Sequence, residues 1–143
     1  MLVRSILKGK GADVFTVSPD ISVIEAVREL NEKRVGAFLV CDKDNAVIGI
    51  LSERDVVRSL AEKGDSALGG TVGDLMTRDV KTCTPDDTID HIMSLMTGRR
   101  FRHVPVMDQG RLVGIVSIGD VVKHKIAETE LEAQSMKDYI ATG

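Results

Sequence analysis

The feature that most constrains this chain is an internal repeat, because the sequence can be read twice at an offset of 66 residues. The segment VFTVSPD at 14–20 matches VKTCTPD at 80–86, and an apolar stripe with helical spacing follows in each copy. The stripes consist of Val23, Ala26, Val27 and Leu30 in the first copy and of Ile89, Ile92, Met93 and Met96 in the second. Self-similarity at a fixed spacing predicts that one supersecondary unit is built twice.

Each copy continues with two short apolar strands and a second helix. The strands are expected at 37–40 and 47–51 in the first copy, and at 103–106 and 112–116 in the second, each pair joined by a polar turn. The second turn is one residue shorter, so the offset falls to 65 beyond it. The unit is therefore strand, helix, strand, strand, helix, which predicts an α/β (α+β) fold. A capping box from Ser22 to Glu25 opens the first helix of the first copy, and Thr88 caps its counterpart.

The repeat also sets the expected domain boundaries. Residues 1–61 form the first repeat with its N-terminal lead-in, 62–70 a glycine-containing linker, 71–125 the second repeat, and 126–143 a helical extension. Even the lead-in is duplicated. Its matching residues are Val3, Ile6 and Leu7 in the first copy and Val72, Leu75 and Met76 in the second.

Composition excludes several classes of protein. With 43% hydrophobic and 29% charged residues, the chain has the apolar content of a globular domain, which argues against a disordered or collagen-like chain. Its 19 basic and 22 acidic residues leave a net charge of −3, so a nucleic-acid partner is not expected. No apolar run approaches the roughly 18 residues that cross a bilayer. The N-terminal apolar stretch is too short for a signal peptide, which favours a cytoplasmic protein without a membrane partner.

Cysteine and histidine residues give no sign of a metal site. Cys41 and Cys83 lie in apolar stretches without the spacing of zinc ligands, and both are expected to be reduced core thiols. His91, His103 and His124 show no helical i, i+4 pairing and no neighbouring cysteine. No metal is therefore predicted.

The sharpest shared motif joins a strand to a helix in each copy. It reads GILSERD at 49–55 and GIVSIGD at 114–120. A serine followed three residues later by an acidic residue is typical of a helix capping box, which needs no ligand. Capping alone gives no reason for the glycine three residues before each serine.

Taken together, the ordered motifs resemble a tandem pair of CBS domains, named after cystathionine beta-synthase, over about residues 3 to 125. The resemblance implies two repeats packed with pseudo-twofold symmetry around two clefts that bind adenine nucleotides. AMP, ATP, NAD(H) and S-adenosylmethionine are the ligands this implies. Asp55 and Asp120 would accept hydrogen bonds from ribose hydroxyls. Ser52 and Ser117, at helix N-termini, would bind phosphate.

The resemblance also implies the other members of each site. The residues expected to line the cleft around adenine are Thr16, Val17, Gly36, Ala37, Phe38, Thr82, Cys83, Val104, Pro105 and Ile118. Their charge and donor groups, rather than the resemblance, suggest additional phosphate ligands: Arg54 in the first copy, and Arg102 and His103 in the second. Because Gly36 and Ala37 correspond to Arg102 and His103, the two clefts are expected to be unequal. The basic run at 99–103 can instead be a nucleic-acid patch or a solvated turn.

Three functions remain in competition at the level of sequence. The leading one is a regulatory module that binds an adenine nucleotide and signals a conformational change to an unidentified protein partner. The second is a structural homodimer with vestigial clefts. The third, an enzyme, lacks a recognisable pair of nucleophile and base.

The C-terminal helix carries its own prediction. Its seam steps by four and three residues and consists of Val122, Ile126, Thr129, Ala133, Met136 and Ile140. This spacing favours a short coiled coil with a second chain in a homodimer. The alternative is packing along the surface of the chain's own module.

Overall fold

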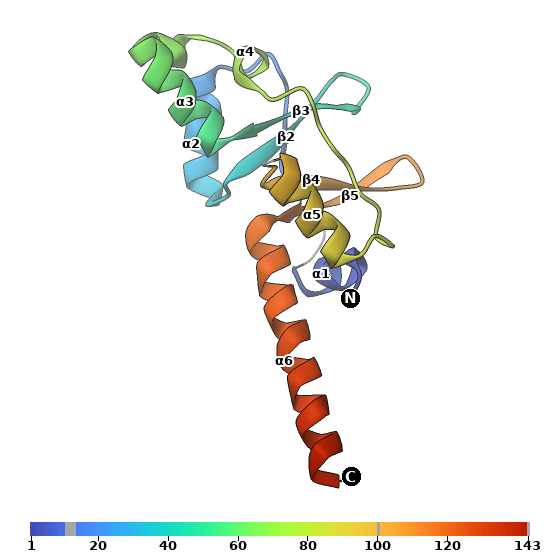
Figure 1. Ribbon diagram of the computed structural model, residues 1–143. Helices are drawn as coiled ribbons and strands as arrows, with labels where there is room; N and C mark the ends of the chain where they lie inside the picture. Colours follow the sequence, from blue (N-terminus) through green and yellow to red (C-terminus); the bar gives the residue numbers. More distant parts are fainter. Residues whose placement is uncertain (11–13, 100, 143) are drawn as a thin grey trace. The chain divides into compact units, whose positions relative to one another are not determined.

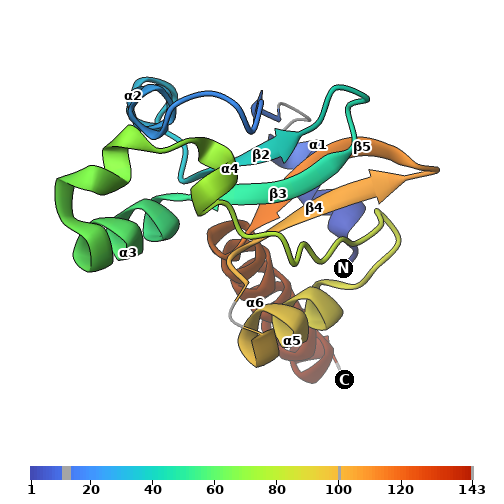
Figure 2. The same ribbon diagram turned by 90° about the horizontal axis from the view of Figure 1, so that it is seen from above.

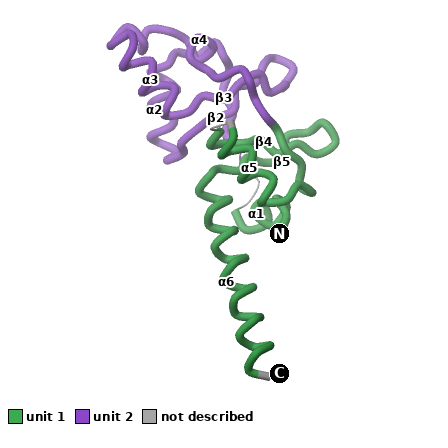
Figure 3. Tube along the Cα trace, viewed as in Figure 1, with its two compact units in different colours: residues 1–12, 82–143 green, residues 13–81 purple. Residues whose placement is uncertain are grey.

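The computed structural model describes residues 1–10, 14–99 and 101–142 and has the mixed α/β architecture that the repeat predicts (Figure 1). The chain forms two compact units, which Figure 3 distinguishes by colour. Unit 2 consists of residues 13–81, and unit 1 combines residues 1–12 with residues 82–143. Each unit has its own sheet and its own apolar core.

Unit 2 is built on a three-stranded sheet in the order β1-β2-β3. Its elements are β1 (Thr16–Val17), α2 (Val23–Lys33), β2 (Ala37–Cys41), β3 (Val47–Ser52), α3 (Glu53–Lys63), the 3-10 helix η1 (Gly64–Gly69) and α4 (Val72–Leu75). Strand β2 pairs parallel to β1 and antiparallel to β3. Phe38, Val40 and Leu51 form the centre of its core with Ala26 and Leu30 of α2. The predicted stripe of α2 is thus the face that is buried.

Unit 1 is built on the antiparallel pair of β4 and β5. Its elements are α1 (Val3–Lys10), α5 (Ile89–Arg99), β4 (His103–Asp108), β5 (Arg111–Ser117) and α6 (Ile118–Thr142). Helices α5 and α6 pack side by side (Figure 2). The core joins Ile89, Ile92 and Met96 of α5 to Val104, Val106 and Val116 of the strands. Here too the predicted helical stripe faces the core.

Side-chain caps begin the helices where the sequence places them. The Ser22 hydroxyl accepts a hydrogen bond from the Glu25 backbone N–H at 3.2 Å. The Thr88 hydroxyl accepts one from the His91 backbone N–H at 3.1 Å. Both bonds satisfy N–H groups that have no acceptor within the helix.

The two units do not follow the boundaries of the sequence repeats, because the lead-ins are exchanged. Helix α1 precedes the first repeat, yet Val3 and Ile6 are fully buried in the core of unit 1. Val72 and Met76, which precede the second repeat, lie in the core of unit 2. The compact units therefore regroup the lead-ins, and 1–61 and 71–125 stay the predicted bounds of the two sequence repeats. Both copies offer a similar apolar surface, so the repeat does not indicate on which copy a lead-in packs.

The predicted linker is also part of unit 2. Helix α3 continues to Lys63, and residues of η1 then form a single 3-10 segment in which Ala67 is buried. The Gly70 carbonyl accepts a hydrogen bond from the Val23 backbone N–H at 3.0 Å, which ties this segment to the start of α2.

The first strand that the repeat predicts for the second copy is reduced to a single bridge between Cys83 and Val106. In unit 2 the Leu39 backbone N–H donates to the Phe15 carbonyl and extends the pairing of β1. The residue at the position of Leu39 in the second copy is Pro105, which has no N–H to donate. Thr82, the counterpart of Thr16 in β1, therefore lies outside a strand, because Pro105 cannot donate the hydrogen bond that Leu39 donates in unit 2.

Candidate functional site

The repeated motif lies at a strand-to-helix junction in both units. In unit 2, β3 ends at Ser52 and α3 begins at the next residue. In unit 1, β5 ends at Ser117 and α6 begins at the next residue. Each serine therefore stands at the N-cap, and Asp55 and Asp120 are each the third residue of a helix. This position places a carboxylate beside backbone N–H groups that lack helical partners.

Reciprocal hydrogen bonds close a capping box in unit 2. The Asp55 backbone N–H donates to the Ser52 hydroxyl oxygen at 3.3 Å. The Ser52 backbone N–H and hydroxyl both donate to Asp55 Oδ2, at 2.9 and 3.0 Å. The capping interpretation of the motif is thus confirmed here.

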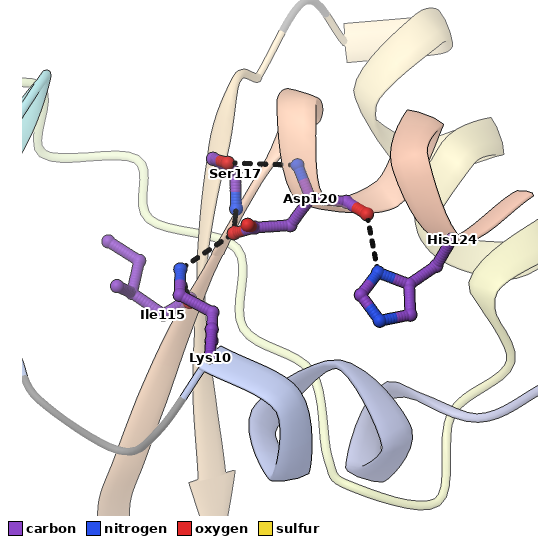
Figure 4. Close-up of polar contacts among 5 residues, drawn as sticks. All are labelled: Lys10, Ile115, Ser117, Asp120 and His124. Atoms are coloured by element: carbon purple, nitrogen blue, oxygen red, sulfur yellow. Dashed lines mark hydrogen bonds and ion pairs between the residues drawn. The ribbon is translucent and has the colours of Figure 1, made fainter. Parts of the chain in front are cut away.

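The same box forms in unit 1 (Figure 4). The Asp120 backbone N–H donates to the Ser117 hydroxyl oxygen at 3.1 Å, and the Ser117 backbone N–H donates to Asp120 Oδ2 at 2.9 Å. His124 Nδ1 lies 2.9 Å from the Asp120 backbone carbonyl, one helical turn along. Capping therefore accounts for the Ser–Asp pair in both copies without a ligand.

A residue from a lead-in adds a further bond to each carboxylate. In unit 2 the Thr77 hydroxyl donates to Asp55 Oδ1 at 3.1 Å, and Arg58 Nη1 lies 3.6 Å from the same oxygen. In unit 1 the Lys10 ammonium donates to Asp120 Oδ2 at 2.6 Å and to the Ile115 carbonyl at 3.0 Å (Figure 4). Sequence reasoning missed Thr77 and Lys10, although the duplicated lead-in was the signal that could have identified them.

The two carboxylates differ in their environment. The Asp55 side chain is 6% exposed, whereas that of Asp120 is 23% exposed. Burial of Asp120 favours its neutral form, but the hydrogen bonds from Lys10 and Ser117 outweigh burial and hold the pKa of Asp120 below its usual value. The Asp120 carboxylate is therefore ionised at neutral pH and paired with an ammonium.

The glycine of each motif makes room for a lead-in side chain. A Cβ on Gly49 would lie 2.6 Å from Met76 Sδ and 3.0 Å from the Thr77 carbonyl oxygen. A Cβ on Gly114 would lie 2.5 Å from Leu7 Cδ2. Leu7 and Met76 are equivalent residues of the two lead-ins. Packing thus explains the glycine that capping left unexplained.

The structure brings some of the other predicted residues next to the motif. Ala37 pairs with Ser52 across the sheet of unit 2, and His103 pairs with Ser117 in unit 1. The carbonyls of Gly36 and Arg102 accept hydrogen bonds from the first N–H of α3 and of α6, at 3.0 and 2.8 Å. These four residues therefore flank the helix N-termini in equivalent places.

Five of the predicted lining residues have buried side chains. They are Val17, Phe38, Cys83, Val104 and Pro105. The side chains of Val17, Phe38, Cys83 and Val104 belong to the two cores, so only the backbone of these four residues is available for a contact with a ligand. The exposed members of the predicted set are Thr16, Thr82, Ile118, Arg54 and Arg102. Arg100 and the side chain of Arg99 lie outside the described residues.

Among the described residues, the cysteines and the other side chains that could ligate a metal form no second site. Burial, assisted by Asp87, raises the pKa of Cys83 to about 12, and burial beside Asp42 raises the pKa of Cys41. Both cysteines are free thiols. Within residues 1–10, 14–99 and 101–142, no cluster of three or more His, Cys, Asp or Glu side chains is arranged to hold a metal ion. None of the helices in these ranges combines the length and the apolar content of a membrane span.

Comparison with known proteins identifies the repeated unit. The profile of the family described as "CBS domain" matches residues 3–62 and 72–127. A CBS-domain-containing protein of Agrobacterium tumefaciens, ATU1752, is 48% identical, with a TM-score of 0.84 over 87% of this chain and 92% of that protein.

Two solved relatives contain ligands. The CBS domain pair of protein MJ0100, in complex with 5′-methylthioadenosine and S-adenosyl-L-methionine, is 28% identical with a TM-score of 0.78 over 90% of this chain and 98% of that one. CBSX2 in complex with AMP is 27% identical with a TM-score of 0.71 over 82% of this chain and 91% of that one.

Proposed function

This chain belongs to the CBS domain family, with two copies of the domain, and from that premise we propose that it is a regulatory module that binds an adenine nucleotide. The observation that carries the proposal is the duplicated Ser–Asp pair, which presents a carboxylate and a hydroxyl at a helix N-terminus in both units. Related domain pairs with bound AMP, S-adenosylmethionine or methylthioadenosine support the ligand class. AMP is the proposed ligand, with ATP, NAD(H) and S-adenosylmethionine as competitors.

The chemistry of the motif suits the ribose and phosphate of such a ligand. An ionised carboxylate has about four acceptor positions, so Asp55 and Asp120 can accept bonds from two vicinal hydroxyls while keeping their capping bonds. Ser52 and Ser117 stand where free N–H groups and the helix dipole favour an anion. Adenine itself is proposed to contact backbone groups of the neighbouring strands, since half of the predicted lining side chains are buried.

The two sites are proposed to differ in their affinity for phosphate. Unit 1 places Lys10, Arg102 and His103 on segments that contact or flank its Ser–Asp pair. In unit 2 the corresponding strand positions are Gly36 and Ala37, and the cations are Arg54 and Arg58 of α3. A phosphate-dependent site in unit 1 and a looser site in unit 2 are the expected result.

The lead-in contacts suggest how binding becomes a signal. A ribose on Asp55 competes with Thr77, because two vicinal hydroxyls need both acceptor positions of Oδ1, whereas Lys10 bonds Asp120 Oδ2 and leaves Oδ1 for the hydroxyls. Ligand binding would therefore loosen a segment that joins one sequence repeat to the other unit. A shift of this kind is what a regulatory module passes to its protein partner.

The fully bonded capping boxes favour one other candidate, a structural module with vestigial sites. In that case Asp55 and Asp120 serve the helices alone. Catalysis is not part of either proposal, because the motif offers binding groups and no nucleophile paired with a base. The cytoplasmic location stays a prediction from the sequence.

Calorimetry with adenosine, AMP, ATP, NADH and S-adenosylmethionine tests the proposal, together with mass spectrometry of ligands carried through purification. Asp55→Asn and Asp120→Asn keep an oxygen that can accept the capping bond but remove the charge. Each is expected to weaken binding at its own site by about 1.5 to 3 kcal/mol, the contribution of a hydrogen bond to a charged group.

The chain offers a matched control for these variants. Asp74 accepts a hydrogen bond from the Thr71 backbone N–H at 3.0 Å, in the same capping position, but has no proposed ligand role. Asp74→Asn should leave nucleotide affinity unchanged. Equal affinity of the parent and of both motif variants, or no heat with any of the five ligands, would favour the structural module.

A further inference from the structure

The C-terminal half of α6 is a long exposed helix with an apolar seam. The first half of α6 forms ion pairs with the rest of unit 1. Lys125 lies 2.9 Å from Asp90, and the N-terminal amine lies 3.7 Å from Glu128. From Thr129 to Ala141 every side chain is exposed, and Figure 1 shows this part of α6 extending beyond the other helices of unit 1. The part of the seam from Thr129 onward therefore does not pack along unit 1, which was the alternative to pairing with a second chain.

The seam follows the heptad pattern of a two-stranded coiled coil. Its a positions are Ile126, Ala133 and Ile140, and its d positions are Val122, Thr129 and Met136. Met136 is 67% exposed and Ile140 is 73% exposed. A helix with such a stripe in water gains stability when a second helix covers it.

Charges beside the seam identify the partner and its direction. In a parallel pair, each g position faces the e position five residues further along the other helix. Here g residues Lys125 and Glu132 face e residues Glu130 and Lys137 of a second copy. Both contacts join opposite charges, and the twofold axis of a dimer makes each of them twice. The pair of Glu132 and Lys137 is expected to contribute most to the stability of the dimer, since Lys125 already pairs with Asp90 of its own chain.

The antiparallel alternative brings like charges together. The alignment that covers the whole seam sets residue 126 opposite 136 and residue 122 opposite 140. Antiparallel helices meet through e–e and g–g contacts. In this alignment Lys123 lies near Lys137, Glu130 near Glu130, and Glu132 near Glu132. Charge therefore selects the parallel arrangement of identical chains.

We propose that residues 122–140 of α6 pair in parallel and in register with the same segment of a second copy of this chain. The interface consists of the six seam residues and of reciprocal ion pairs between Glu132 and Lys137. This inference is independent of nucleotide binding, because the segment lies beyond the Ser–Asp motif of α6 and shares no residue with it.

Disulfide trapping at the end of the seam tests both the pairing and its direction. Ile140→Cys, in a Cys41→Ser background, places two thiols opposite each other in the parallel pair but about 27 Å apart in the antiparallel one. Under oxidised glutathione the full-length variant is expected to form a covalent dimer. The Cys41→Ser chain without Cys at 140 is the control and should remain uncoupled.

Charge reversal tests the ion pairs. Glu132→Lys is expected to raise the dimer dissociation constant by about tenfold, because two attractive contacts become repulsive. Lys137→Glu should do the same, and an equimolar mixture of the two single variants should crosslink at position 140 as mixed dimers in preference to either homodimer. Ser135→Lys, on the outer face of the helix, is the matched control and should leave crosslinking unchanged.

Several outcomes would overturn the proposal. A parent chain that sediments as a monomer at tens of micromolar, or an Ile140→Cys chain that does not crosslink, excludes parallel pairing of this segment. The proposed register is excluded if adding Glu132→Lys to the Ile140→Cys chain leaves its crosslinking rate unchanged and mixed dimers are not preferred. The crosslinking results are read from covalent coupling in this helix, so dimer contacts elsewhere in the chain do not obscure them.

Discussion

Asp55 in unit 2 and Asp120 in unit 1 occupy the same position of the same capping box, and the difference between them lies in what the lead-in brings to each. Asp55 is buried and accepts a hydrogen bond from the neutral hydroxyl of Thr77. Asp120 is half-buried and forms a hydrogen-bonded ion pair with the ammonium of Lys10. The boxes themselves are nearly identical because helix N-termini have the same unsatisfied N–H groups in both units. The serine and aspartate of the box are therefore the same in both copies, whereas the lead-in residue that bonds the carboxylate differs.

The two motif glycines show the same contrast in packing. The neighbours of Gly49 include the Thr77 backbone carbonyl, whereas the close atoms around Gly114 all belong to the Leu7 side chain. A side chain can change rotamer, but a paired backbone has little freedom to move. The lead-in is thus held more rigidly against the motif in unit 2.

The largest expected effect is on stability when these glycines acquire a Cβ. Gly49→Ala should lower the free energy of unfolding by about 2 kcal/mol, as overpacking does in a well-packed core. Gly114→Ala should cost less than about 1 kcal/mol, because Leu7 can move. Urea denaturation followed by circular dichroism gives both values.

Glycines in open space provide the controls. Nothing lies within 4 Å of a Cβ built on Gly69 in unit 2 or on Gly98 in unit 1. Alanine at either position should leave stability unchanged or raise it slightly. Equal losses for Gly49→Ala and Gly114→Ala would remove the proposed difference in rigidity.

The next effect concerns ligand discrimination and depends on the proposed function. Lys10→Met should reduce the preference for AMP over adenosine by about tenfold, the loss of one charge-assisted hydrogen bond to phosphate. Lys8→Met, which changes an exposed lysine of the same helix, is the control. Calorimetric titration of both variants with both ligands measures the change. If the AMP preference of Lys10→Met equals that of the parent, Lys10 only neutralises Asp120.

Thr77 and Lys10 should also differ in what they contribute to folding. Thr77→Val leaves a buried carboxylate without one donor and should cost about 1 kcal/mol at any salt concentration. Lys10→Met breaks an ion pair between partly exposed groups and should cost about 0.5 kcal/mol at low salt. The cost of Lys10→Met should shrink toward zero in 1 M NaCl, where charges on the surface are screened. Denaturation of both variants at low salt and in 1 M NaCl measures the two costs. A cost of Thr77→Val that changes with salt would contradict the contrast between a neutral hydrogen bond and an ion pair.

The smallest effect is the pH dependence of Asp120. Because its pKa is lower in the folded chain than in the unfolded one, its ionisation stabilises unit 1 above the unfolded pKa of about 4. That stabilisation is lost as the pH falls through the lower folded pKa. Asp120→Asn should therefore reduce stability by a constant amount from pH 5 to 7 and by progressively less below pH 4. A gap between parent and variant that widens toward acid would reverse the assigned sign.

Much of the architecture follows from local patterns in the sequence. The stripe of α2, the Ser22 and Thr88 caps, and the hairpin of β4 and β5 were all predicted correctly, since helix periodicity, capping and turns depend on neighbouring residues. The Ser–Asp motif was located for the same reason. The loss of the strand around Thr82 was also readable in principle, because it follows from the proline at position 105.

The sequence by itself determined that one unit is built twice, that each copy ends in a capped helix, and that a carboxylate stands at each cap. Only the tertiary structure decided which copy each lead-in packs against, and hence that Lys10 meets Asp120 while Thr77 meets Asp55. The repeat is silent on this choice because two homologous units offer nearly the same apolar surface to either lead-in. Two contacts decide which unit each lead-in joins. Thr77 is 22 positions from Asp55 and Lys10 is 110 positions from Asp120, so no local pattern encodes either contact.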